Sequence, residues 1–245
     1  MSEQNSPLSN SKVLLLDIGN SRIKACLVEN RRLSPMLVLE QTDALMPLLA
    51  NVNKCLVSAV GQSQKRQAIE LLLKQQSIPL IYLQTTAEYA GLRCGYSDFT
   101  QLGIDRWLAM LGCKRRCDSD FAVLDFGTAM TCDLVTKKGQ HLGGWIAPGI
   151  HTMQTALVTQ TERLTNQFVS PPQLALGNTT QACINMGTFA AMQGFLLSAV
   201  GYMDQHSQDY RIFIGGGDAS ALCQLAGPQV EYIEHLVFEG MLEFI

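Results

Sequence analysis

The sequence has few charged side chains and no long uninterrupted apolar run. Of its 245 residues, 16% are charged, and 18 basic against 21 acidic residues give a net charge of −3. Without a basic surplus, neither a nucleic acid nor a membrane surface is predicted as a partner. No apolar stretch has the length that spans a bilayer, and the polar residues 2–11 do not form a signal peptide. We therefore expect a cytoplasmic globular protein with a disordered tail over residues 1–11.

Motifs of several common enzyme and metal sites are also absent. The eight cysteines form no CxxC pair, and the four histidines show no metal-binding spacing. Scattered cysteines in such a chain indicate reduced thiols rather than zinc ligands or disulfides. There is no GxxxxGK[ST] loop and no GxGxxG fingerprint, so neither of these nucleotide-binding modes is predicted.

What the sequence does contain is an alternation of strand and helix patterns. Residues 55–60 and 78–84 are apolar strand candidates, and residues 62–76 between them have helical periodicity, which predicts a parallel βαβ unit. Residues 143–150, GGWIAPGI, are predicted to be a loop. Further strands are predicted at 13–17, 23–30, 121–135 and 211–214, and helices from Leu102, over 151–170 and over 179–203.

Two segments are near copies of each other. DIGNSRIKACLV begins at Asp17 and DFGTAMTCDLV begins at Asp125, and each follows an apolar strand and leads into another. Such pairing predicts a duplicated α/β architecture, with similar domains over 12–118 and 119–245 facing each other across a cleft. The alternative is chance, because DxG is a common hairpin turn.

The polar residues of these two turns suit a phosphate and its metal ion. Glycine lets the backbone approach a ligand closely, and an aspartate at a strand end can hold a cation directly or through water. Asn20, Ser21, Thr128 and Thr131 offer neutral donors to phosphate oxygens, and Lys24 adds a positive charge.

The segment GIDRW, residues 103–107, places an acid next to an arginine at a predicted helix start. Adjacent residues on a helix point in different directions, so Asp105 and Arg106 can address different groups. Asp105 suits a hydroxyl proton, and Arg106 suits a carboxylate or phosphate. On the residues alone, an exposed helix start with an acid favoured by the helix dipole is the simpler interpretation.

Taken together, these motifs resemble a known family. DIGNSRIK, GYSDFTQLGIDRW, LDFGTAMTCDLV and GGWIAPGI occur in the order found in type III pantothenate kinases, from about Val13 to the C-terminus. The resemblance implies the ribonuclease H-like fold of sugar kinases and actin-like ATPases. It also implies ATP-dependent phosphorylation of pantothenate to 4'-phosphopantothenate, the first step of coenzyme A biosynthesis.

The resemblance also assigns roles to individual residues. Asp105 matches the proton acceptor, Asp17 is expected to organise Mg²⁺ on the phosphates, and Asp125 matches a ligand of a monovalent cation, K⁺ or NH₄⁺. Thr180 matches a pantothenate contact made across a homodimer interface. The ATP contacts implied are Asp17, Ile18, Gly19, Asn20, Ser21, Arg22, Ile23, Lys24 and Thr128, and the other pantothenate contacts are Tyr96, Gly103, Ile104, Asp105 and Arg106.

The sequence departs from the family pattern at two positions. Phe99 stands where a proline is common, which affects the loop that carries Tyr96. Gly215 stands where a threonine is usual, which removes a hydroxyl near the expected adenosine pocket. Two other functions stay open: a kinase of another small carboxylated alcohol or sugar, and a non-enzymatic accessory factor for transcription.

Overall fold

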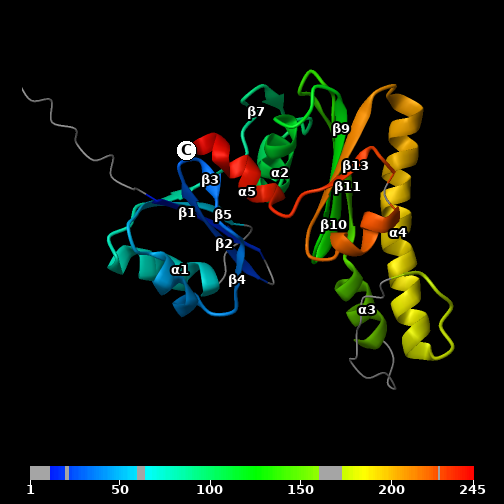
Figure 1. Cartoon of the computed structure of the whole chain (residues 1–245), viewed down its shortest axis with the longest axis horizontal. Helices are drawn as coiled ribbons and strands as arrows, with labels where there is room; N and C mark the ends of the chain where they lie inside the picture. Colours follow the sequence, from blue (N-terminus) through cyan, green and yellow to red (C-terminus); the bar gives the residue numbers. More distant parts are fainter. Residues whose placement is uncertain (1–11, 20–21, 60–63, 160–172, 226) are drawn as a thin grey trace, which may run out of the picture. The chain divides into compact units, whose positions relative to one another are not determined.

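The chain folds into two compact units (Figure 1). The computed structural model describes residues 12–19, 22–59, 64–159, 173–225 and 227–245. The first unit comprises the described residues up to Gln84 together with Met241–Ile245, and the second comprises Thr85–Gly240. The predicted domains, 12–118 and 119–245, divide the chain just before the second repeat rather than after Gln84. That division stays a prediction.

The first unit is built on a mixed sheet with the strand order β3-β2-β1-β5-β6, in which β4 also pairs with β2. Strands β1 and β2 are antiparallel, whereas β1, β5 and β6 are parallel neighbours. The elements are β1 (Lys12–Ile18), β2 (Ile23–Glu29), β3 (Arg32–Leu33), β4 (Leu37–Leu39), η1 (Thr42–Leu48), β5 (Val52–Ala59), α1 (Gln64–Gln75), β6 (Leu80–Tyr82) and η4 (Leu242–Phe244). The predicted βαβ unit is therefore confirmed as β5-α1-β6.

Alternation along β1 determines which side chains enter the first core. Leu14, Leu16 and Ile18 belong to the same buried cluster as Ile69 and Leu73 of α1. Because successive side chains of a strand point to opposite faces, Asp17 projects from the other face of this sheet. The sequence pattern thus keeps the carboxylate out of the apolar cluster.

The second unit repeats this architecture with the strand order β11-β10-β9-β12-β13. Its sheet elements are β9 (Asp120–Phe126), β10 (Ala129–Val135), β11 (His141–Pro148), β12 (Tyr210–Gly215) and β13 (Val230–Tyr232). The remaining elements are β7 (Glu88–Tyr89), β8 (Leu92–Arg93), η2 (Phe99–Gln101), α2 (Ile104–Lys114), α3 (Ile150–Thr159), α4 (Thr180–His206), η3 (Ala219–Leu225) and α5 (Leu236–Met241).

The two sheets share one topology. In each, the first strand of the repeat (β1 or β9) forms an antiparallel hairpin with the next and pairs in parallel with a later strand, β5 or β12. A further parallel strand, β6 or β13, follows on the same side. Chance similarity of two turns would not produce this agreement, so the predicted duplication is confirmed at the level of strand order.

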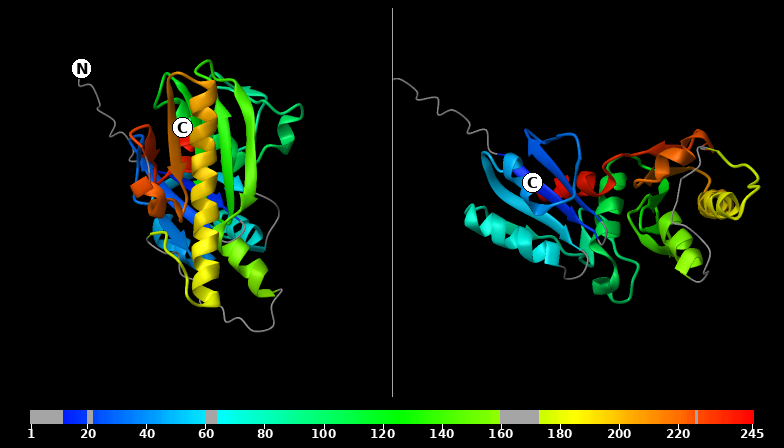
Figure 2. Two further views of the ribbon diagram at one scale, coloured as in Figure 1. Left: turned by 90° about the vertical axis from the view of Figure 1, so that its right-hand side faces the viewer. Right: turned by 90° about the horizontal axis from the view of Figure 1, so that it is seen from below.

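Helices α4 and α2 lie on opposite faces of the second sheet, and Figure 2 shows α4 running along one face. Ala122, Leu124 and Phe126 of β9 share a buried cluster with Phe189 and Leu196 of α4. The alternate residues of β9 and β10 therefore face α2. Asp125, Thr131 and Asp133 are on that side.

Helix α4 has the length and hydropathy of a membrane span, with a mean hydropathy of 1.4 over its best window within 27 residues. By length and composition alone, the expectation that the chain holds no such segment is wrong. Many of the apolar residues that raise this average are small. Only 28% of this window is buried, and the buried part is the face with Phe189, Met192 and Leu196, which packs in the second core.

Two other expectations are revised. GGWIAPGI is not a loop, because most of it is β11, which pairs with β10 from Ala129↔Pro148 to Val135↔His141. The helix predicted over 151–170 is described as α3, Ile150–Thr159, and residues 160–170 lie outside the described part of the chain. The described residues contain no disulfide, as the cysteine spacing predicts.

Candidate active site

The first DxG turn joins β1 to β2. Asp17 is the penultimate residue of β1 and is 9% exposed, and its Oδ1 accepts a hydrogen bond of 3.1 Å from Oγ of Ser58 on β5. The Gly19 amide donates to the carbonyl of Arg22 at 3.1 Å, and Lys24 is the register partner of Asp17. Asn20 and Ser21 lie outside the described residues. This turn thus keeps a carboxylate and a lysine on adjacent strands.

The second DxG turn joins β9 to β10 and packs against the glycine-rich segment IGGGDA, residues 214–219. Asp125 is the register partner of Thr131 and of Gly215. Gly216 has φ +96°, and a β-carbon there would overlap Oδ1 of Asp125 and the carbonyl of Phe126. The amide of Asp218 donates to the same carbonyl at 3.1 Å. Only glycine at position 216 leaves the Asp125 carboxylate its space.

The end of GGWIAPGI returns to this same turn. The Thr128 carbonyl accepts from the Gly149 amide at 3.0 Å and from Oγ1 of Thr152 at 2.7 Å. A β-carbon on Gly149 would overlap the Gly127 carbonyl. Three motifs that are far apart in the sequence therefore meet around Asp125 and Thr128.

Asp105 lies in the first turn of α2 and is half-buried. Its Oδ1 accepts from the Arg106 amide at 2.9 Å, so the carboxylate satisfies an amide of the first turn, where the helix dipole also favours an acid. A β-carbon on Gly103 would stand 2.5 Å from that oxygen, which explains why glycine precedes the acid by two positions. The G-x-D spacing thus makes room for a fixed carboxylate.

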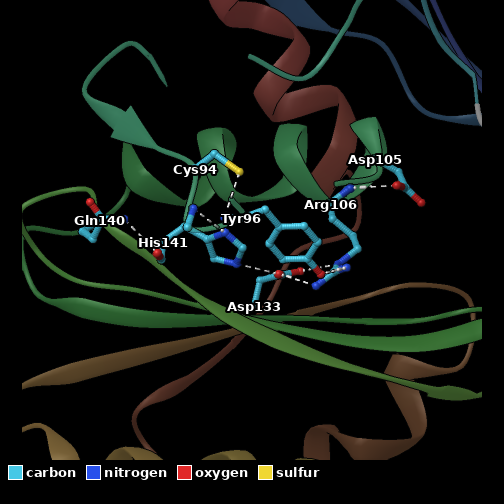
Figure 3. A network of polar contacts seen from close by, with 8 residues as sticks. Cys94, Tyr96, Asp105, Arg106, Asp133, Gln140 and His141 are labelled. Atoms are coloured by element: carbon cyan, nitrogen blue, oxygen red, sulfur yellow. Dashed lines mark hydrogen bonds and ion pairs between the residues drawn. The ribbon is translucent and has the colours of Figure 1, made fainter. Parts of the chain in front are cut away.

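Arg106 is buried, which contradicts the simpler interpretation of GIDRW as an exposed helix start. Its guanidinium donates from Nε to Oδ2 of Asp133 at 2.8 Å and from Nη2 to Oδ1 at 2.6 Å, and Nη1 donates to the Tyr96 hydroxyl at 3.0 Å (Figure 3). Burial lowers the pKa of Arg106, but the hydrogen bonds and charge of Asp133 outweigh it and raise the pKa above its usual value. The arginine is permanently charged.

His141 completes this network from β11. Its Nε2 lies 2.9 Å from Oδ1 of Asp133, and its Nδ1 lies 3.3 Å from the Gly95 amide. The ring stacks on Tyr96 with centroids 5.8 Å apart and an interplanar angle of 20°. Figure 3 shows Tyr96, Arg106, Asp133 and His141 converging between α2 and the second sheet.

The sequence reasoning missed Asp133 and His141. A signal for Asp133 was present, because an acid inside the apolar strand TCDLV needs a buried partner. No comparable signal marked His141, since its partners lie at positions 95 and 133. Glycines make room here too: a β-carbon on Gly144 would lie 2.9 Å from Oδ1 of Asp133 and 3.0 Å from Nη2 of Arg106.

The remaining predicted residues lie apart from this network. Thr180 is exposed at the first position of α4, whose N-cap is Thr179. Phe99 begins η2 and is 37% exposed. Gly215 has no room for a side chain, because a β-carbon would overlap Leu236 and approach the Ile233 carbonyl to 2.9 Å.

The predicted metal ligands are single carboxylates. The described residues hold no group of three or more His, Cys, Asp or Glu that could bind a metal ion by themselves. Magnesium commonly keeps several waters and takes one or two carboxylates together with substrate phosphates. Asp17 lies at a strand end, and the Gly216 backbone packs closely against the Asp125 carboxylate, so each predicted ligand would contribute one carboxylate.

A duplicated sheet of this topology, with an aspartate near the end of the first strand of each repeat, is the fold class of actin-like ATPases and sugar kinases. One solved structure of similar fold is a putative N-acetylmannosamine kinase, Lmo2764, from Listeria monocytogenes. It has a TM-score of 0.50, 14% identity and coverage of 95% of this chain and 96% of that chain. The predicted fold class is confirmed.

Within this class the chain belongs to the type III pantothenate kinase family, whose model matches residues 13–201. It is 36% identical to a type III pantothenate kinase of Pseudoalteromonas atlantica over 100% of this chain and 99% of that protein. It is 34% identical to one of Pseudomonas fluorescens, over 94% and 97%. The resemblance inferred from the motifs is confirmed.

A second solved structure is a conserved putative Baf family transcriptional activator from Campylobacter jejuni. It is 25% identical to this chain, has a TM-score of 0.58 and covers 93% of this chain and 94% of its own. The likeness extends across both units of the fold.

Proposed function

We propose that this protein is a kinase that transfers the γ-phosphoryl group of ATP to the primary hydroxyl of pantothenate, giving 4'-phosphopantothenate for coenzyme A biosynthesis. The observation that supports this best is the position of Asp105. Its carboxylate is fixed by the Arg106 amide and fits beside Gly103, within the residues that the family model matches. Family membership over the whole chain supports the activity.

Phosphoryl transfer depends mainly on positioning and on charge neutralisation, with little covalent work by the protein. In this proposal Asp105 accepts or orients the proton of the substrate hydroxyl. Its Oδ1 is engaged by the Arg106 amide, and its Oδ2 makes no hydrogen bond to any other described residue. The carboxylate is thus anchored by one oxygen and can offer the other to the hydroxyl.

We propose ATP contacts for the residues of each DxG turn, each turn taken by itself. In the first turn these are Asp17, Gly19, Arg22 and Lys24, the backbone of Ile18 and Ile23, whose side chains are buried in the first core, and the undescribed Asn20 and Ser21. In the second turn it is Thr128. Mg²⁺, when bound, would neutralise the developing phosphate charge. Asp17 would hold it, and Asp125 would hold K⁺ or NH₄⁺.

The test is coupled ADP production with pantothenate, ATP, Mg²⁺ and K⁺. We expect turnover that depends on pantothenate and stays at background when pantothenate is omitted. A panel of other acceptors, including small hydroxy acids and sugars, would be assayed in parallel. Turnover with one of these and none with pantothenate would overturn the substrate assignment.

A role as a transcriptional accessory factor is the weaker candidate. It has a counterpart in the name of the Campylobacter jejuni protein, a putative transcriptional activator. The kinase is favoured because the curated relatives are pantothenate kinases and because Asp17, Asp105 and Asp125 are all present.

We further propose a cytoplasmic homodimer that contacts through the outer face of α4. Gly187 and Gly194 on this helix leave open space beside the backbone, and Leu197 is 58% exposed. Small residues let helix backbones approach closely, and an exposed leucine among them favours burial against a partner. In this proposal Thr180 of each copy would reach the pantothenate bound to the other.

A further inference from the structure

Asp133 connects the residues proposed to contact pantothenate. It comes from the middle of β10 and is 2% exposed, yet its two oxygens accept three hydrogen bonds, two from Arg106 and one from His141. A buried carboxylate requires this compensation. Arg106 and the loop that carries Tyr96 are thereby tied to the same strand.

The surroundings of His141 determine its tautomer. Nδ1 faces the N–H of Gly95 and therefore accepts, so the proton lies on Nε2 and is donated to Asp133. A β-carbon on Gly95 would overlap the His141 carbonyl, so this contact needs glycine at that position. His141 thus fixes the backbone at Gly95, just before Tyr96, and its imidazole also holds the Tyr96 ring by stacking.

The direction of the hydrogen bond between Arg106 and Tyr96 follows from their chemistry. Arginine can only donate, so the Tyr96 oxygen accepts from Nη1 at 3.0 Å. The hydroxyl proton of Tyr96 must therefore point to another acceptor. No described residue accepts it, so the proton is available to an oxygen of a bound substrate.

We infer that Asp133 and His141 are positioning residues that fix the Tyr96 hydroxyl as a hydrogen-bond donor to a carboxylate or amide oxygen of the acceptor substrate. The Arg106 guanidinium is then not fully available to a substrate carboxylate, because three of its five N–H groups donate to Asp133 and Tyr96. Two N–H groups remain for the substrate. This inference rests on the proposed function for the identity of the substrate, not for the geometry of the network.

A double-mutant cycle on the acceptor KM tests the inference. Tyr96→Phe removes the donor, and His141→Leu removes the contacts that orient it. We expect each to raise the KM for pantothenate up to about tenfold, the equivalent of one hydrogen bond, with the KM for ATP unchanged. In the Tyr96→Phe background, His141→Leu should add less than about twofold, because His141 acts through the tyrosine.

Thermal unfolding checks that each variant is folded. If His141→Leu is not, His141→Gln replaces it, because glutamine keeps polar atoms but loses the ring that stacks on Tyr96. Tyr232→Phe, at a tyrosine 42% exposed on β13, is the matched control and should leave both KM values unchanged. Independent effects of the two substitutions, or an equal rise in the KM for ATP, would overturn the inference.

The cycle separates this inference from the proposed function. Wild-type turnover with pantothenate is measured first, and if another acceptor is used instead, the cycle is run on the KM of that acceptor. Coupling with the other acceptor would support the network and reject pantothenate. Turnover of pantothenate without coupling would support the kinase and reject the role of His141, and with it the positioning of Tyr96 through the Asp133 network.

Discussion

Arg106 and Asp133 form a buried ion pair in which both carboxylate oxygens are used, with relative side-chain exposures of 7% and 3%. Helix α2 and strand β10 supply one partner each, so the pair joins two layers of the second unit. Removing one partner of such a pair leaves the other charged and desolvated.

Arg106→Met should therefore lower the free energy of unfolding by about 3–5 kcal/mol. Arg116→Met is the matched control, because Arg116 pairs with Glu231 and Glu239 near the surface and should lose no more than about 1 kcal/mol. Urea unfolding followed by circular dichroism measures both. Equal losses would show that the buried pair contributes no more than a surface pair.

Asp105→Asn should reduce turnover by about 10²- to 10⁴-fold, because the substrate hydroxyl loses its proton acceptor. Asp118→Asn, at an exposed aspartate beyond α2, should keep wild-type turnover. The measurement is steady-state ADP release, with circular dichroism to verify folding. A folded Asp105→Asn enzyme with normal turnover would rule out this role.

Asp125→Asn should abolish activation by K⁺ without changing the thermal midpoint by more than a few degrees. The carboxylate provides the negative charge that attracts the cation, and asparagine preserves its shape. Turnover is measured against KCl concentration, with choline chloride holding the ionic strength constant. An unchanged K⁺ response in the variant would reject Asp125 as the ligand.

Gly215→Thr, which restores the residue usual in the family, should destabilise this chain by about 1–3 kcal/mol. The added atoms would overlap Leu236 and approach the Ile233 carbonyl, so β12 or the segment before α5 must shift. Differential scanning calorimetry measures the change. A variant as stable as the wild type would show that Leu236 and its backbone neighbours yield without cost.

Leu197→Asp should convert the proposed dimer into monomers, because it places a charge on the outer face of α4. Leu71→Asp is the control, since Leu71 is 59% exposed on α1 and Leu197 is 58% exposed on α4. Sedimentation velocity gives the mass of each variant. If Leu197→Asp remains a dimer, the interface lies elsewhere. If the wild type is a monomer, the proposed dimer does not exist.

Much of the fold could be predicted because its signals are local. The apolar strands before Asp17 and Asp125 and the helical periodicity before Gln75 depend on neighbouring residues, and they appear in the structure as β1, β9 and α1. GGWIAPGI was misjudged because its glycines make room for the buried pair and for the turn at Thr128 rather than for a flexible loop.

Residues of the candidate site were predicted only where they belong to a local sequence motif. Asp105 and Arg106 were found in GIDRW, but the burial of Arg106 was not, because its partner Asp133 is 27 positions away. His141 joins the network through the Gly95 backbone, 46 positions away. Pairings over such distances follow from sheet register and helix docking, which neither composition nor local spacing encodes.

The register of the two repeats shows how a duplicated residue acquires two kinds of surroundings. Opposite Asp17 on the parallel neighbouring strand stands Ser58, which donates to the carboxylate, whereas opposite Asp125 stands Gly215, followed by Gly216 against the carboxylate. The first carboxylate thus accepts a hydrogen bond from a facing hydroxyl, whereas the second has the backbone of two glycines packed against it. The two halves keep one strand order and still give their corresponding aspartates different neighbours.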